Sequence, residues 1–299
     1  MPAKQKITYC LWVNQEAEAV AKFYTGVFKN SAMGDIARNP VDTPSGKAGT
    51  VLTTTFTIEG QPFLALNGGS QYDLNPSISF FLHAGSAEEI DDLWEKLSEG
   101  GQVLMPLDKY PYSDKYGWVQ DKFGLSWQLM LPNPGAEKRP RLMPSLLFVN
   151  KVYGQAEEAL GFYTSVFRDS RTGTVAKYPA GLEPDQEGKV MYADLMLEGQ
   201  WFALMESGDQ HAFAFNPALS FMVHCDSQAE IDHYWNKLSG EGGQEVQCGW
   251  LNDKYGVAWQ IVPEALLKLL AGPDKERAKR VMQAMMKMVK LDIQQLEEA

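Results

Sequence analysis

The chain repeats itself, and this duplication constrains its fold more than any other feature. The segment WVNQEAEAVAKFYTGVF at 12–28 returns as FVNKVYGQAEEALGFYTSVF at 148–167. The segment FTIEGQPFLALNGG at 56–69 returns in the same way as LMLEGQWFALMESG at 195–208. Because the matches keep their order along the chain, they indicate a duplicated domain rather than chance similarity.

The duplication predicts where the chain divides. Each half closes on a similar motif, DKFGLSWQ in the first half and DKYGVAWQ in the second. A segment rich in proline and charge separates the halves, as is typical of a linker. We therefore predict two consecutive domains, a linker and a C-terminal helical tail, with the boundaries 1–132, 133–144 for the linker, 145–263, and 264–299 for the tail.

Within each half the hydrophobic pattern alternates between strands and helices. Asn14 is placed to cap a first helix, and Ser86 with Glu89 has the spacing of a capping box for a second one. The turns IEGQPF and LEGQWF join runs that alternate like strands. The pattern predicts two βαβββ modules in each half and an α+β fold. An insertion at 106–116, which the second half largely lacks, is predicted to be a loop at the edge of a binding cleft.

Composition narrows the possible partners. The 299 residues carry a net charge of -11, which disfavours binding to phosphate backbones or anionic lipid. No stretch of about eighteen apolar residues is present, and the N-terminal segment lacks the apolar core of a signal peptide. Three cysteines cannot all pair. We expect a cytoplasmic protein with reduced thiols and no nucleic-acid or membrane partner.

The paired βαβββ pattern, FYTGVF in the first helix and the closing DKFGLSWQ together resemble the glyoxalase, or vicinal oxygen chelate, superfamily. The helical tail makes the chain similar to the PhnB-like branch, labelled 3-demethylubiquinone-9 3-methyltransferase. The resemblance implies two tandem glyoxalase-like domains, each a curved mixed sheet with helices on its outer face and a ligand cleft on its concave face. Relatives often pair as separate subunits, so the chain is expected to be a monomer that mimics a dimer, or a homodimer.

The resemblance also raises the question of a metal, because enzymes of the superfamily usually hold a divalent ion in the cleft. Alignment with the family places hydroxyl or apolar residues at most ligand positions and an amide, Gln128 or Gln260, at the last. Such a set is a poor site for zinc, nickel or iron. We expect no metal and no cofactor. Side chains near these positions remain as alternative ligands: Asn67, His83, Glu206 and His224.

What remains is a pocket. The alignment and the alternation of side chains along strands place hydroxyl, thiol, amide and aromatic groups on one sheet face in each half. A cleft with an aromatic wall and a few hydrogen-bonding groups suits a small, partly apolar organic ligand. The predicted ligand-binding residues are Thr8, Cys10, Trp12, Ser79, Gln128, Phe148, Ser220 and Gln260.

The leading hypothesis is thus a metal-free small-molecule-binding protein, with turnover left open and no catalytic residue assigned. One alternative is a metal-dependent lyase, isomerase or dioxygenase. Another is the methyltransferase of the family label, although no glycine-rich GxGxxG loop is present to hold a cofactor. A third is an interaction protein that uses its acidic surface and tail. The apolar stripe of the tail, which includes Val281, Met285, Met288 and Leu296, is predicted to pack on the second domain or across a dimer.

Overall fold

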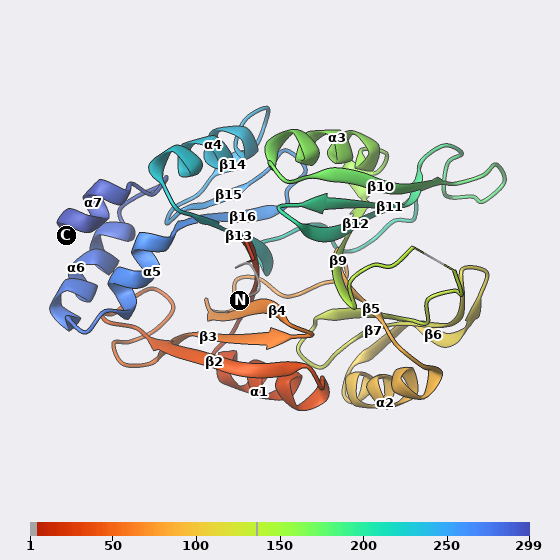
Figure 1. Ribbon diagram of the computed structural model, residues 1–299, viewed down its shortest axis with the longest axis horizontal. Helices are drawn as coiled ribbons and strands as arrows, with labels where there is room; N and C mark the ends of the chain where they lie inside the picture. Colours follow the sequence, from red (N-terminus) through yellow and green to blue (C-terminus); the bar gives the residue numbers. More distant parts are fainter. Residues whose placement is uncertain (1–4, 136) are drawn as a thin grey trace. The chain divides into compact units, whose positions relative to one another are not determined.

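The computed structural model describes residues 5–135 and 137–299. The chain forms two compact units that do not follow chain order. Unit 1 contains the residues up to Thr25 together with Asn30–Asp73 and Phe215–Ala299, and unit 2 contains Gly26–Lys29 and Leu74–Ala214. Each unit is built around one eight-stranded mixed sheet, coloured by sequence in Figure 1.

The sheet of unit 1 has the strand order β14-β15-β16-β13-β1-β4-β3-β2. Its strands are β1 (Ile7–Val13), β2 (Ser31–Arg38), β3 (Val51–Ile58), β4 (Gln61–Asn67), β13 (Leu219–Cys225), β14 (Gln244–Glu245), β15 (Trp250–Asn252) and β16 (Ala258–Pro263). Helices α1 (Ala17–Val27) and α4 (Gln228–Leu238) complete its two βαβββ modules. The apolar side of α1 meets the sheet where Tyr24 stacks on Phe56 of β3.

The sheet of unit 2 repeats this plan in the order β10-β11-β12-β9-β5-β8-β7-β6. Its strands are β5 (Ile78–His83), β6 (Gln102–Tyr110), β7 (Ser113–Gln120), β8 (Ser126–Met130), β9 (Leu142–Val149), β10 (Arg171–Lys177), β11 (Val190–Leu197) and β12 (Gln200–Ser207). Helix α2 (Ala87–Ser98) packs on β7 and β8, and α3 (Ala156–Val166) packs on β11 and β12. The predicted α+β class with four βαβββ modules is confirmed.

The modules do not pair within each half of the chain, as a division at 133–144 would suggest. Strand β1 pairs with β13, and β5 pairs with β9, so each sheet joins a module of the first half to a module of the second. Each junction is made by the first strands of two modules. Because all four modules offer the same kind of edge at this strand, their hydrophobic pattern does not distinguish one partner from another.

Local signals in the sequence predict most element boundaries. The Ser86 side chain accepts from the Glu89 amide at the start of α2, and the Glu89 carboxylate accepts from the Gly85 amide. The predicted hairpin between β3 and β4 turns through Glu59 and Gly60, both at positive φ, as a type I′ turn requires.

The prediction that Asn14 caps the first helix is wrong. The side-chain Oδ1 of Asn67, at the end of β4, accepts from the amide of Ala17 instead. This cap comes from a residue fifty positions away, so no local spacing signals it.

The tail forms three helices in unit 1: α5 (Glu264–Ala271), α6 (Lys275–Met285) and α7 (Ile293–Glu298). Figure 1 shows them grouped beyond the end of β16. Their buried side chains Leu266, Val281 and Leu296 pack with Met222 of β13 and Val262 of β16. Of the predicted apolar stripe, Val281 and Leu296 are therefore core, and Met285 and Met288 pack against the same cluster while partly buried.

No helix among the described residues is long and apolar enough to cross a membrane.

Candidate functional site

Each sheet has one face that carries the glutamine of the repeated WQ motif, and we call it the glutamine face. Directly paired residues of neighbouring strands share a face, and successive residues alternate between faces. In unit 2 the register aligns Ser126 of β8, Ser79 of β5 and Ser145 of β9 in one row across this face. The row continues through Ala203 of β12 to Asp194 of β11.

Gln128 is held in a fixed orientation beside the serine row. Its side-chain Nε2 donates to Ser79 Oγ at 2.8 Å, and the Tyr116 hydroxyl donates to its Oε1 at 2.7 Å. Burial raises the pKa of the Tyr116 hydroxyl well above its ordinary range, so this phenol stays protonated and remains a donor. The predicted site residues Ser79 and Gln128 are thus in direct contact.

Three polar groups of unit 2 near this glutamine are buried without a partner. They are the hydroxyls of Ser126 and Ser145 and the indole Nε1–H of Trp118. Trp118 pairs with Gln128 across β7 and β8 and therefore lies on the same face. A buried polar group without a hydrogen bond costs about 1–3 kcal/mol. Native proteins retain few such groups, so three on one face indicate a candidate binding site.

The surroundings of the serine row are aromatic and rich in methionine. Phe81, Tyr116, Met143 and Ala203 form a buried cluster. Partly buried side chains pack against it: Met105, Tyr110, Trp118, Met130, Tyr192, Trp201 and Met205. Methionine adapts its shape readily and makes favourable contacts with aromatic rings. The face combines fixed polar groups with a deformable apolar lining.

The insertion at 106–116 is a hairpin of β6 and β7 rather than the predicted loop. Its alternating pattern is interrupted by three register shifts, which hide the strand periodicity in the sequence. The hairpin supplies three aromatic residues of the lining, namely Tyr110, Tyr116 and Trp118. These residues were missed by the sequence prediction, although the tyrosine-rich composition of the segment is a visible signal.

In unit 1 the glutamine face brings together five predicted residues, but in a different combination from the one expected. Thr8, Cys10 and Trp12 of β1 share their face with Ser220 rather than with Ser79, because β1 pairs with β13. The Gln260 amide donates to Ser220 Oγ at 2.9 Å. Hydrogen bonds also link the Cys10 thiol to both of these side chains. This polar cluster is therefore satisfied internally.

Trp12 sits at the edge of that face. Its indole N–H donates to the carbonyl of Gly69 at 2.8 Å, and its ring meets Tyr72 and Trp250 edge to face. The ring lies directly over Gly68, where a Cβ atom would come within 2.2 Å of it. Glycine is therefore required at position 68, and Trp12 is a partly exposed aromatic side chain.

The prediction for Phe148 is wrong in its geometry. Phe148 pairs with Glu206, whereas Leu147 pairs with Met205, so Phe148 lies on the helix-covered face and is fully buried. In the repeated motif Phe148 aligns with Trp12. This alignment is misleading because the second half has extra residues before α3. They form a short 3-10 turn, Asn150–Val152, and shift the strand by one position. Leu147 is the structural counterpart of Trp12.

The tail helices cover the glutamine face of unit 1. Leu64 and Met222, which pair with Cys10 and Thr8, pack against the cluster that contains Leu266 and Leu296. His224 ties the first tail helix to the sheet. Its Nε2 lies 2.9 Å from Thr8 Oγ1, and its Nδ1 lies 2.9 Å from Oε1 of Glu264, the first residue of α5.

His83 holds the corresponding place in unit 2. Its Nδ1 lies 2.7 Å from the carbonyl oxygen of Pro140 in the linker, so Nδ1 carries the proton because a carbonyl only accepts. Burial lowers the pKa of His83, and the ring is therefore neutral at neutral pH. The two histidines named as alternative metal ligands both anchor covering segments.

The donor set does not fit a divalent metal. Both carboxylate oxygens of Glu206 accept from backbone amides, those of Ala156 at the start of α3 and Val190 at the start of β11. In unit 1 the Oδ1 of Asn67 accepts from the Ala17 amide in the same way, but its Nδ2 donates to the Val51 carbonyl. Within residues 5–135 and 137–299, no group of three or more His, Cys, Asp or Glu side chains is placed to hold a metal ion. The amide oxygen of Gln128 already accepts from Tyr116.

The thiols should differ in reactivity. None of the three cysteines forms a disulfide, and Cys10 and Cys225 are buried while Cys248 is partly exposed. Burial raises the pKa of Cys10 to about 11. Its thiol is thus neutral at mildly alkaline pH, and only the thiolate attacks an alkylating reagent. We expect iodoacetamide to label Cys248 first in the native protein, as read by peptide mass spectrometry; labelling of Cys10 before Cys248 would contradict the closed state of the unit 1 face.

A surface hollow of about 420 Å3 lies over α4 and is lined by Ala229, Asp232, His233, Asn236 and Lys237. Its lining comes from one helix, and none of these side chains is an unpartnered buried group. The glutamine face of unit 2 is the stronger candidate.

The comparisons with known proteins give a family. The family described as 3-demethylubiquinone-9 3-methyltransferase matches residues 5–130 and again residues 140–262. The comparison with curated proteins gives no match. A PhnB protein from Bacillus cereus is 41% identical over 42% of this chain and 99% of its own, with a TM-score of 0.40. A protein from Staphylococcus aureus is 35% identical over 43% of this chain and 97% of its own, with a TM-score of 0.18.

A solved structure that spans both halves gives the fold. A mutant of glyoxalase I from Zea mays is 13% identical over 87% of this chain and 93% of its own, with a TM-score of 0.54. At this identity the likeness shows the fold alone, and it agrees with the four βαβββ modules. The family match covers most of the chain and occurs twice, so the chain belongs to the PhnB-like 3-demethylubiquinone-9 3-methyltransferase family, in tandem form and with a glyoxalase-like fold.

Proposed function

We propose that the protein binds a small organic molecule on the glutamine face of unit 2. The observation that carries this proposal is the set of buried, unpartnered groups on Ser126, Ser145 and Trp118 beside the anchored amide of Gln128. Without a ligand these groups destabilise the fold, whereas a ligand with hydrogen-bond acceptors removes that cost. Unsatisfied polar groups that lower the stability of the fold at one face are typical of a binding site.

The lining favours a neutral ligand with a flat apolar part. The indole of Trp118 only donates, and the two serine hydroxyls can both donate and accept. The charge on the nearby Asp194 is already matched by Arg139. Aromatic rings and methionines around the row, such as Phe81 and Met143, suit an aromatic or conjugated ring. The expected ligand therefore combines such a ring with carbonyl or similar oxygens.

Binding at unit 2 alone implies one ligand per chain. In unit 1, Ala258 takes the place of Ser126, because it pairs with Ser220 as Ser126 pairs with Ser79. The Cys10, Ser220 and Gln260 cluster is satisfied internally, and tail helices cover the same face. The two faces thus differ in both free hydrogen-bonding capacity and access.

The proposal predicts opposite effects of the serine variants on stability and on binding. Ser126→Ala and Ser145→Ala should each raise the free energy of unfolding by about 1 kcal/mol, because an unpaired buried hydroxyl is removed. The same variants should weaken the binding of neutral aromatic carbonyl compounds found in a thermal-shift screen of the wild type. Urea denaturation and titration calorimetry measure the two effects.

Thr54→Val is the matched control. The Thr54 hydroxyl is also buried and unpartnered, but it lies on β3 in unit 1. This variant should raise stability and leave binding unchanged. Serine variants that bind as tightly as the wild type would show that the serine row is not the site.

A further inference from the structure

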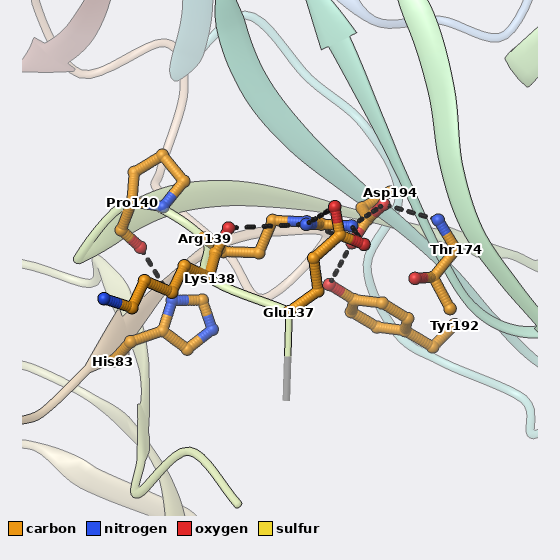
Figure 2. Close-up of polar contacts among 8 residues, drawn as sticks. All are labelled: His83, Glu137, Lys138, Arg139, Pro140, Thr174, Tyr192 and Asp194. Carbon is orange, nitrogen blue, oxygen red and sulfur yellow. Dashed lines mark hydrogen bonds and ion pairs between the residues drawn. The ribbon is translucent and has the colours of Figure 1, made fainter. Parts of the chain in front are cut away.

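Residues 137–141 of the predicted linker lie against the glutamine face of unit 2. Figure 2 shows Arg139 reaching from the linker to Asp194 of β11. Nε of Arg139 donates to one carboxylate oxygen at 2.8 Å and Nη2 to the other at 3.1 Å. The next residue, Pro140, contacts His83 of β5 through its carbonyl. We call residues 137–141 the strap.

The pocket around the Arg139 side chain has the chemistry of a guanidinium site. Asp194 offers two carboxylate oxygens, one also bonded by the Thr174 amide at 2.8 Å and the other by the Tyr192 hydroxyl at 3.1 Å. The Trp201 ring lies 4.0 Å from the guanidinium carbon. A carboxylate that accepts two parallel bonds, together with an aromatic face, matches the planar fork of a guanidinium group.

The Arg139 side chain is buried although the strap residues before it are exposed. The side chain of Arg139 is 7% exposed and that of Asp194 is 3% exposed, whereas Glu137 and Lys138 of the strap are exposed. An exposed segment thus inserts one buried charged group between side chains of β11 and β12. In unit 1 the position of Asp194 is taken by Thr55, since both pair with corresponding residues of the next strand, Ala203 and Leu64.

The strap leads into β9 and contacts the strands on either side of it. His83 lies on β5 and Trp201 on β12, and β9, which starts at Leu142, runs between these two strands. Phe81 and Met143 of the apolar lining are paired on β5 and β9. Phe81 precedes His83 by two residues on β5, so both side chains lie on the same face. The strap therefore lies over one end of the proposed binding face.

We propose that Asp194, Tyr192 and Trp201 form a guanidinium-binding site that the chain fills with its own Arg139, and that this contact locks the strap over the glutamine face of unit 2. A molecule that carries a guanidinium group can replace Arg139 and release the strap. The site shares Tyr192 and Trp201 with the lining of the proposed binding face and lies where the serine row ends at Asp194, but it does not depend on a ligand binding at the serines.

The experiment uses the full chain with Arg139→Ala, which leaves the buried Asp194 without its charged partner. We expect the Tm to fall by several degrees and methylguanidinium at millimolar concentration to restore at least half of the loss, whereas methylammonium restores much less. Arg141→Ala is the matched control, since Arg141 pairs with Glu89 in a more exposed contact, with side chains 39% and 23% exposed. Methylguanidinium should give it no comparable recovery. If Arg139→Ala does not fold, Arg139→Lys provides the test through a smaller loss and a smaller recovery.

Oxidation of Met143 by peroxide, mapped by mass spectrometry, tests the strap. It should be several-fold faster in Arg139→Ala than in the wild type and should stay fast when methylguanidinium is bound, because the free cation fills the site without restoring the strap. Absence of recovery by methylguanidinium would overturn the guanidinium site, and unchanged oxidation of Met143 would overturn the lock. Neither readout involves the small molecule of the proposed function, so its failure would be seen separately.

Discussion

Deletion of residues 273–299 is expected to lower the free energy of unfolding of unit 1 by about 5 kcal/mol or more, since a fully buried valine or leucine contributes about 1.5–3 kcal/mol. The deletion removes the buried side chains of Val281, Leu291 and Leu296. It also removes part of the cover over Met222 and Val262 on the sheet. Urea denaturation followed by tryptophan fluorescence measures the loss, and a hydrophobic dye should bind the truncated chain.

Point variants separate the packing of the tail from the effect of its length. Leu296→Ala should cost about 2–4 kcal/mol, because it leaves a cavity in a fully buried position. Val289→Ala is the control, since Val289 is 41% exposed, and it should change stability by less than about 0.5 kcal/mol. A truncated chain as stable as the full chain would contradict the role of the tail as core and support a free interaction surface.

Replacement of Asp121 by alanine is expected to destabilise unit 2 by about 3 kcal/mol or more, because hydrogen bonds to a charged acceptor contribute about 1.5–3 kcal/mol each. The buried Asp121 carboxylate accepts from the amides of Phe123 and Leu125 and from the indole N–H of Trp127. Its loss leaves three donors unpaired, two of them buried, just before the strand that carries Gln128. Urea denaturation of the variant measures the effect.

Two variants serve as controls for Asp121. Asp92→Ala removes a carboxylate that is half exposed and paired with Lys96 on one helix, so it should cost less than about 0.5 kcal/mol. Asp253→Ala should repeat the large loss in unit 1, where Asp253 accepts from Tyr255, Val257 and Trp259 in the same way. A small effect of Asp121→Ala would mean that this motif is not held by its aspartate.

The repeated DKFGLSWQ motif shows why much of the fold can be predicted from the sequence. Asp121 and Trp127 contact each other six residues apart, so their bond is encoded locally. The same holds for the cap at Ser86 and for the turn at Glu59 and Gly60. Elements defined by near neighbours leave a periodic or positional signal that can be read directly.

The pairing of modules has no such local signal. The first strand of each module presents the same edge and a similar apolar pattern, and the choice of β13 over β5 as partner of β1 is a long-range decision. It determines which predicted residues meet: Gln260 rather than Gln128 lies on the face of Cys10. A short insertion after β9 likewise moves Phe148 to the opposite face without changing its motif.

The covering segments could be predicted only in part. The apolar stripe of the tail is visible in the sequence, but the sheet face that it covers is not. Arg139 and Asp194 lie 55 residues apart, and the only hint in the sequence is an acidic residue in the middle of an apolar strand, MYADLML. A charge at such a position requires a partner, although the pattern does not say which one.

We expect one small organic molecule to bind to the glutamine face of unit 2. Native mass spectrometry of protein prepared without chelators and incubated with a small-molecule cell extract tests it most directly, with Gln128→Ala and Gln260→Ala as a matched pair. We expect one organic adduct per chain in the wild type and in Gln260→Ala, and a loss of this adduct in Gln128→Ala. A stoichiometric metal mass, or an organic adduct that survives in Gln128→Ala and is lost in Gln260→Ala, would contradict the account.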